Sequence, residues 1–243
     1  MRQRKKKIIL IAAAFLIVMA VVLAVCLLRP RTSDIIETPS QDQPSDASGQ
    51  QTEPSQDPID LGFGLKLTAL SEVTGNYPED GSDEFVESML SATFQNEGDQ
   101  TIQYASVQVI IGEEEFAFVF TTLPAGESVR VFEADRKELA GSPNDVSAEI
   151  ESIAFFQEEP SIYENELEIT VADGLICVKN ISGKDIDKEI SVFYKTASDD
   201  MYIGGITYRL RIPAGLPAGE EYLGNAIHAS ETMSKVMFVT YGE

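Results

Sequence analysis

The sequence predicts an all-β protein of two tandem β-sandwich units, which follow an apolar N-terminal segment and a polar linker. Three observations support this fold class. Beyond residue 58, apolar residues alternate with polar ones at a period of two, which is typical of half-buried strands. The pentapeptide Leu-Pro-Ala-Gly-Glu occurs twice, at 123–127 and at 216–220. No stretch after the N-terminal segment has clear helical periodicity, although residues 136–139 are long enough for one turn.

Residues 8–28 carry no charge, and five basic residues precede them. A helix of this length rises about 31 Å, close to the thickness of the hydrocarbon core of a bilayer. Because basic flanks are retained in the cytoplasm, we expect a cytoplasmic tail at 1–7, a single-pass anchor in a cell membrane at 8–28, and an extracellular remainder. Two alternatives are cleavage as a signal peptide, although no Ala-x-Ala site follows, and lipidation of Cys26 in a Leu-Ala-Val-Cys sequence that resembles a lipobox.

Residues 29–58 are rich in proline, serine, glutamine and acidic residues, with few apolar ones. This composition predicts a disordered linker. Its residues 30–57 would extend at most ~90 Å, so the folded part is expected to stay near the membrane.

Two β-sandwich units are predicted at 59–158 and 161–243, with a boundary near Pro160. Each contains six or seven short segments of strand-like alternation separated by turn residues, which is the pattern of a sandwich. The clearest alternations run over 167–171 and 206–212, and the same pattern is present at 65–69 and 116–120.

An asparagine–glycine turn precedes each copy of the pentapeptide, Asn96 to Gly98 in the first unit and Asn180 to Gly183 in the second. We expect the asparagine amides to bond nearby backbone and the glycines to adopt positive φ. In Leu-Pro-Ala-Gly we expect proline at the second turn position and glycine at the fourth. These repeated sequences therefore indicate a scaffold and not chemistry.

Three segments of the second unit match a known pattern: Val-Lys-Asn-Ile-Ser-Gly-Lys-Asp-Ile at 178–186, Ser-Val-Phe-Tyr at 191–194 and Leu-Pro-Ala-Gly-Glu at 216–220. They resemble the FxLYD-type, immunoglobulin-like β-sandwich domains of Gram-positive bacterial membrane-anchored envelope proteins. The resemblance covers 165–241 well and 86–157 more loosely. Lys195 stands where that family commonly has aspartate. The resemblance implies tandem extracytoplasmic immunoglobulin-like units without catalytic residues to carry over.

All 40 acidic residues but only 11 of the 18 basic ones follow residue 31, which gives that part a formal charge of −29. Such a field repels phosphate backbones and anionic lipid, so it argues against nucleic-acid binding. It permits the binding of cations, of Ca²⁺ or of a basic partner. The alternative is that the acidic surface only keeps an exported domain soluble and has no further role.

The chain has two cysteines, Cys26 in the predicted anchor and Cys177 in a predicted strand. They cannot pair within one molecule, so no intrachain disulfide is expected. This suits a bacterial envelope protein that relies on packed cores. We interpret Cys177 as a core residue.

No catalytic or cofactor-binding residues are predicted. His228 is the only histidine, which excludes a His-rich metal site, and we interpret it as a lone partly buried or surface residue. The acidic segment 76–84 offers Asp80, Asp83 and Glu84 as candidate calcium ligands, although the EF-hand spacing is missing and a solvated loop is the alternative.

The predicted function is a non-catalytic interaction or scaffold module, tethered to a bacterial membrane, that holds another protein of the cell envelope. A calcium-responsive structural spacer is one alternative. A cell-wall polysaccharide hydrolase with paired carboxylates is another, although the chain has no tryptophan on which a sugar would stack.

Overall fold

A computed structural model of the chain describes residues 57–82, 84–138, 145–198 and 200–242. In these ranges the protein is all-β, as predicted, with thirteen strands. The predicted anchor at 8–28 and nearly all of the linker at 29–58 lie outside them. Within the described ranges, no helix is long and apolar enough to cross a bilayer. Residues 51–243 form one compact unit.

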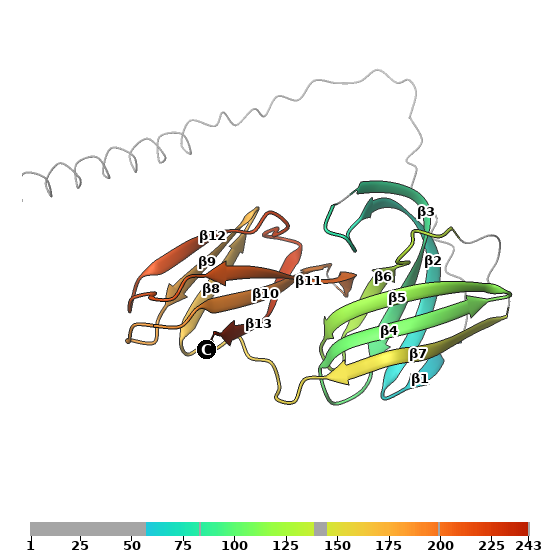
Figure 1. Cartoon of the computed structure of the whole chain (residues 1–243), viewed down its shortest axis with the longest axis horizontal. Coiled ribbons are helices and arrows are strands. Elements are labelled where there is room, and N and C mark those ends of the chain that lie inside the picture. The colour runs from blue at the N-terminus through green and yellow to red at the C-terminus, as the bar shows by residue number, and fades with distance from the viewer. Residues whose placement is uncertain (1–56, 83, 139–144, 199, 243) are drawn as a thin grey trace, which may run out of the picture. The chain divides into compact units, whose positions relative to one another are not determined.

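Figure 1 traces the strands in chain order. The N-terminal half, which falls within 59–158, contains β1 (Ile59–Gly62), β2 (Leu65–Tyr77), β3 (Glu84–Asn96), β4 (Ile102–Ile111), β5 (Glu114–Leu123), β6 (Ser128–Phe132) and β7 (Val146–Phe155). The C-terminal half, which falls within 161–243, contains β8 (Leu167–Ala172), β9 (Leu175–Asn180), β10 (Ile190–Ala197), β11 (Tyr202–Ile212), β12 (Glu221–Asn225) and β13 (Ser234–Tyr241).

The strands form one seven-stranded sheet, in the order β1-β2-β3-β6-β11-β10-β13, and two three-stranded sheets, β5-β4-β7 and β12-β9-β8. Neighbouring strands are antiparallel, except that β6 and β11 run parallel. Their pairing, Val129 with Tyr202 and Arg130 with Ile203, joins the two halves. A sheet shared by both halves was not predicted.

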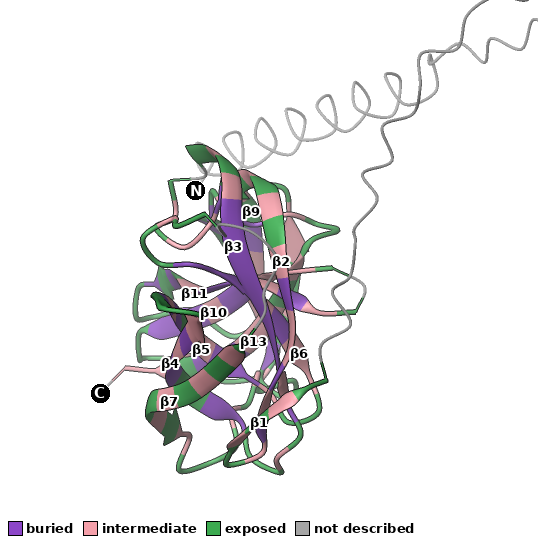
Figure 2. Ribbon diagram, turned by 90° about the vertical axis from the view of Figure 1, so that its right-hand side faces the viewer, coloured by how far each residue is buried: buried purple, intermediate pink, exposed green. Residues whose placement is uncertain are grey.

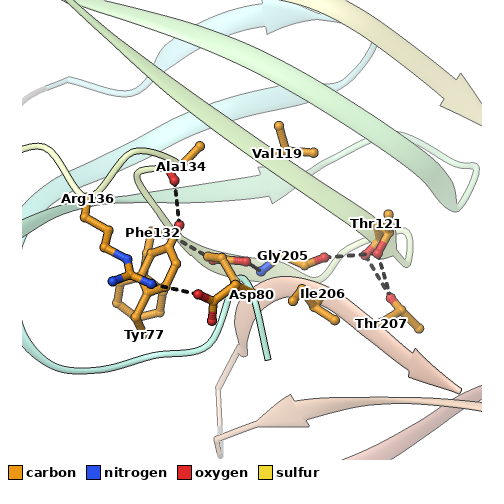
Figure 3. A pocket seen from close by; sticks show the side chains of 11 residues that line it. Tyr77, Asp80, Val119, Thr121, Phe132, Ala134, Arg136, Gly205, Ile206 and Thr207 are labelled. Carbon is orange, nitrogen blue, oxygen red and sulfur yellow. Dashed lines mark hydrogen bonds and ion pairs between the residues drawn. The ribbon is translucent and has the colours of Figure 1, made fainter. Parts of the chain in front are cut away.

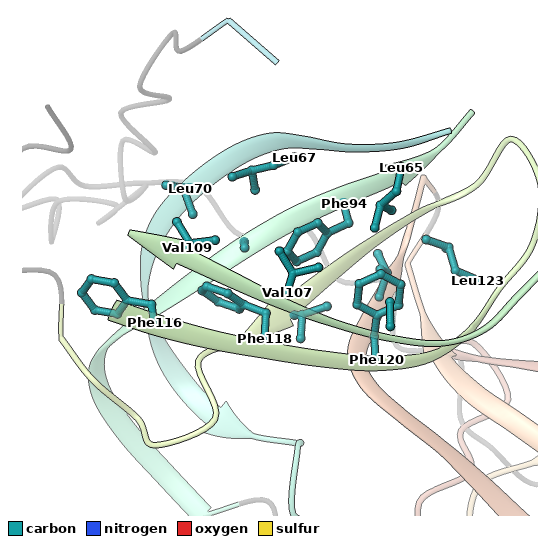
Figure 4. Packing of buried hydrophobic residues seen from close by; sticks show 14 of the residues in the cluster. Leu65, Leu67, Leu70, Phe94, Val107, Val109, Phe116, Phe118, Phe120 and Leu123 are labelled. Atoms are coloured by element: carbon teal, nitrogen blue, oxygen red, sulfur yellow. The ribbon is translucent and has the colours of Figure 1, made fainter. Parts of the chain in front are cut away.

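Each half has its own hydrophobic core. In the N-terminal half, Phe118 packs edge-on against Phe94 at 5.9 Å between ring centroids, and Phe120 packs against the same ring at 5.2 Å (Figure 4). Phe116 is buried as well, which confirms the predicted alternation. Buried residues also run along the C-terminal part of β3 (Figure 2). Tyr202, from β11 of the C-terminal half, belongs to this same core, so the first core includes a residue of the second half.

Cys177 is not a core residue, and the interpretation above is wrong on this point. Its neighbours Ile176 and Val178 are fully buried and belong to the second core, so alternation turns Cys177 to the outer face of β9. There it is half-buried, with Sγ 3.9 Å from a carboxylate oxygen of Glu221. Burial and the Glu221 charge raise the pKa of the Cys177 thiol, which makes it a poor nucleophile.

The two asparagines of the internal repeat occupy equivalent positions and are fully buried. Each side-chain amide donates to two backbone carbonyl oxygens and accepts one backbone N–H two residues later. The donated bonds join Asn96 Nδ2 to Gln100 O (2.9 Å) and Leu123 O (3.0 Å), and Asn180 Nδ2 to Lys184 O (2.7 Å) and Leu216 O (3.0 Å). The predicted role of these amides is confirmed, and the repeat in sequence is a repeat in structure.

The Leu-Pro-Ala-Gly-Glu turns differ from the prediction by one position. The N–H of Glu127 donates to Pro124 O at 3.3 Å, which puts proline first and glycine third in the turn. Gly126 and its counterpart Gly219 both have φ of 79°, as the third position of a type II turn requires. In the preceding turns, Gly183 adopts positive φ as predicted, but Gly98 does not.

Candidate functional site

The junction between the two halves is built around an irregularity in β11. Tyr208 pairs with Tyr194 and Ile203 pairs with Thr196, so residues 204–207 lie opposite Lys195 alone. Gly204 has φ of 81°, which glycine adopts without strain. A Cβ at the next residue, Gly205, would overlap the carbonyl oxygen of Val119 on β5. The glycine pair therefore lets β11 bend and approach β5 closely.

Lys195 is fully buried at this junction. Its Nζ donates to the carbonyl oxygens of Thr121 and Gly205, both at 3.0 Å, so it bonds to backbone of both halves. Burial lowers its pKa from 10.5 to about 7, and the charge of Glu79 opposes that shift. A neutral amine has two N–H donors, which match the two carbonyl acceptors. A protonated amine has a third N–H in a buried site.

Glu79, in the loop after β2, holds the same junction from the other side. Its Oε1 accepts the N–H of Phe132 at 2.9 Å, and its Oε2 accepts the N–H of Gly205 at 2.6 Å. Burial raises the pKa of Glu79, and the two backbone N–H groups and Lys195 oppose that shift. Among the described residues, no basic group forms an ion pair with this carboxylate.

A cavity of about 470 Å³ lies beside these groups (Figure 3). Its lining comes from both halves: Tyr77, Glu79, Asp80, Val119, Thr121, Phe132, Ala134, Arg136, Gly205, Ile206 and Thr207. At one side, the Arg136 guanidinium lies 4.5 Å from the centroid of the Tyr77 ring. The Tyr77 hydroxyl donates to Ala134 O at 2.8 Å. This wall is therefore ordered by contacts within the N-terminal half.

The structure brings two of the calcium candidates together. Asp80 and Glu84 each form a 2.7 Å ion pair with Arg136. Asp83 lies outside the described residues. The described part of the chain contains no group of three or more His, Cys, Asp or Glu residues placed to hold a metal ion. A calcium ion near Asp80 would have to displace the guanidinium, and the calcium hypothesis stays a prediction.

A second, apolar cleft of about 520 Å³ shares Thr121 and Thr207 with the first cavity. The two threonine hydroxyls are 2.9 Å apart and bond to each other across the junction. Three aromatic rings pack in this cleft: Phe238 stacks on Phe193 at 4.3 Å and meets Phe156 edge-on at 5.3 Å. The β5–β11 contact is thus flanked by one polar and one apolar depression.

His228 also belongs to the junction. Its ring stacks on Tyr208 at 4.5 Å. A Cβ on Gly81 would lie 3.8 Å from the Tyr208 ring and 3.9 Å from the imidazole, which places the loop after β2 against these residues. The histidine therefore packs between the halves, with no second histidine in the sequence to form a metal or catalytic pair.

The buried junction gives a pH-dependent prediction. Because burial lowers the pKa of Lys195 to about 7, the unfolded chain binds one more proton than the folded chain above that pH. The free energy of unfolding should therefore rise from pH 7.5 to pH 9, by about 1 kcal/mol per pH unit from this residue. Lys195→Met should remove that slope, because methionine fills a similar volume without titrating.

Urea unfolding at pH 7.5, 8.25 and 9 measures this slope for the wild-type chain and Lys195→Met. Other titrating groups are common to both, so the difference between the two curves isolates the lysine. The two carbonyl oxygens that lose Nζ keep hydroxyl donors, since Thr121 Oγ1 lies 3.0 Å from Gly205 O and Thr207 Oγ1 lies 3.4 Å from Thr121 O. Parallel curves for the two proteins would show that Lys195 is protonated in the folded chain throughout this range.

Sequence reasoning placed Asp80 and Glu84 in one acidic loop but missed Glu79 and Lys195 as the groups that join the halves. The signal for Lys195 was its position, because it is a lysine that follows the apolar residues of a predicted strand. Glu79 has no comparable signal, because it precedes Asp80 in a loop of similar residues. Comparison of the chain with family models, with curated proteins and with solved structures finds no match.

Proposed function

We propose that this protein is a non-catalytic interaction module of a bacterial cell envelope, anchored in the membrane by residues 8–28 with its N-terminus in the cytoplasm. Residues 59–158 and 161–243 would be extracellular immunoglobulin-like sandwiches that hold another envelope protein. The uncharged run at 8–28, its basic flank and the matches at 178–220 support this proposal.

One observation carries the proposal: the two halves share a sheet and enclose clefts at their junction. Because β6 pairs with β11, the walls contributed by the two halves have a fixed spacing. A fixed composite surface suits recognition, since little conformational freedom is lost when a partner binds. The polar cavity is bounded on one side by Val119, which is 38% exposed and accessible to a partner.

The buried ionisable groups near the junction favour binding over catalysis. Glu133 is fully buried and accepts three backbone N–H groups, from Ala117, Asp135 and Lys137. Glu79 accepts two such groups, and Lys195 donates to two carbonyls. Glu133 and Lys195 do not line the cavity, whereas a general acid, base or nucleophile must face the substrate. Glu79 does line it, but both of its oxygens also hold backbone N–H groups of the fold.

The two other hypotheses have less support. The calcium spacer requires oxygen ligands that are instead occupied by Arg136. A polysaccharide hydrolase requires two carboxylates facing a cleft. The cavity does contain Glu79 and Asp80, but Glu79 is bonded to backbone through both oxygens and Asp80 is paired with Arg136.

Photo-crosslinking in intact cells tests the proposal. A photoreactive amino acid at Val119, in the full-length chain, is expected to give one discrete adduct that protease added outside the cells degrades. Leu175 is a matched control, because it is 37% exposed and lies on β9, away from both clefts. No adduct from Val119, equal adducts from both positions, or an adduct that external protease spares would each count against the proposed function.

A further inference from the structure

The size and walls of the junction cavity suit a small group on an apolar stem. Its volume of about 470 Å³ lies within the range of sites that bind small molecules. Val119, Phe132 and Ile206 contribute apolar surface, whereas Glu79 and Asp80 contribute carboxylates. An occupant would therefore place an aliphatic part against the apolar side chains and a polar end against the two carboxylates.

The charges around the cavity favour a cation at that polar end. The lining holds two carboxylates and one guanidinium, that of Arg136. Arg136 is shared between Asp80 and Glu84, and the side chain of Glu84 is 62% exposed and does not line the cavity. Lys195 donates to the carbonyl oxygen of Gly205, whereas Glu79 accepts the N–H of the same residue. Because its pKa is about 7, Lys195 is protonated in only about half of the molecules at that pH. Among the described residues, Glu79 is thus the carboxylate of the lining that forms no ion pair, and Lys195 acts on it through its charge alone.

Glu79 retains the capacity to accept further bonds. Each of its oxygens accepts one backbone N–H, and an ionised carboxylate offers about four lone-pair sites. Hydrogen bonds from an ammonium or guanidinium group to a carboxylate are roughly twice as strong as neutral ones. The formal charge of −29 beyond residue 31 also steers cations toward this part of the chain.

We propose that this cavity binds an alkyl ammonium or guanidinium group, such as the side chain of a lysine or arginine in a basic segment of the partner. Glu79 accepts its N–H groups, and Val119 and Ile206 contact its aliphatic stem. This inference rests on the proposed function and specifies the chemistry of the partner. A free diamine carries the same chemistry, and the experiment separates the two sources.

Calorimetric titration of the full-length chain in detergent at pH 7.5 tests the inference with three probes. They are a capped pentapeptide with one central lysine between glycines, the same peptide with norleucine, and 1,5-diaminopentane. The lysine peptide is expected to bind at least tenfold more tightly than the norleucine peptide. If the diamine binds more tightly than the lysine peptide, the natural occupant is a free amine and the partner assignment is overturned.

Two charge variants locate the site. Glu79→Gln should weaken the lysine peptide about tenfold, whereas Glu113→Gln, in the exposed β4–β5 turn, changes net charge equally and should leave binding unchanged. Equal weakening by both would mean that only the overall field attracts the peptide, and the inference would fail. Because Glu79→Gln also alters the junction, its melting temperature is measured alongside.

A second variant does not depend on Glu79. Val119→Lys puts an ammonium on a stem at the cavity wall, where it should occupy the site and weaken the lysine peptide at least tenfold. Val119→Met, of similar length but neutral, should weaken it less. Equal effects of the two would contradict a cation site. If the peptides fail to bind but Val119 still crosslinks a partner in cells, the cation inference is wrong and the proposed function stands. If the lysine peptide binds but Val119 crosslinks no partner, the cation site stands and the proposed function is wrong.

Discussion

Alanine at position 205 is expected to separate the two halves of the chain. Its Cβ would overlap the carbonyl oxygen of Val119 and lie 2.9 Å from Oε2 of Glu79 and 3.1 Å from Cα of Phe120. Two of these neighbours are backbone of β5, which is paired with β4 along its length and cannot yield locally. The strand β11 must therefore move away from β5, so its bonds to Glu79 and Thr121 are lost, together with the bond from Lys195 Nζ on β10 to Thr121 O.

The expected cost is on the order of 3–5 kcal/mol, because overpacking against backbone is combined with the loss of a buried hydrogen-bond network. Differential scanning calorimetry should show two transitions in place of one, since each half retains its own core. Gly75→Ala is the control: its Cβ would meet nothing within 4 Å, and its φ is not positive. A single transition for Gly205→Ala, at the melting temperature of Gly75→Ala, would mean that the junction adapts to the extra methyl group.

The strands could be predicted because they depend on local patterns. Alternation over 116–120 requires only that one face of a strand meets the core, and the buried phenylalanines follow it. A local irregularity already limits this reasoning in β2: the register shifts between Leu67 and Ala69, so Leu70 and not Ala69 is fully buried. A bulge of this kind moves the following side chains to the other face.

The junction could not be predicted, because no local pattern specifies it. Parallel pairing of β6 and β11 involves two residue pairs more than 70 positions apart in sequence. The tandem repeat favoured two separate units, since each copy contains a complete set of turn and strand signals. Of the junction residues named above, only Lys195 departs from the apolar pattern of its own strand. Glu79 gains its role from Gly205 and Phe132, which reach it only in the folded chain.

Loss of either repeated asparagine should destabilise the whole of residues 59–241. Asn96→Ala leaves the carbonyl oxygens of Gln100 and Leu123 without the amide donor, at a fully buried position. Buried polar groups left unsatisfied, together with the lost turn contacts, should cost about 2–4 kcal/mol. Asn180→Ala removes the equivalent bonds to Lys184 and Leu216, so a similar cost is expected.

The two variants also test whether the halves unfold together. Because the halves share a sheet and Tyr202 of β11 lies in the first core, either substitution should lower the single melting temperature of both halves. Differential scanning calorimetry measures the melting temperature and the number of transitions, and urea unfolding measures the free energy of unfolding. Asn225→Ala is the control, since Asn225 is exposed on β12. In a tandem of independent units, each variant would shift only the transition of its own half. A joint shift for Asn96→Ala and Asn180→Ala, set against two separated transitions for Gly205→Ala, would place the coupling of the halves at the β5–β11 contact.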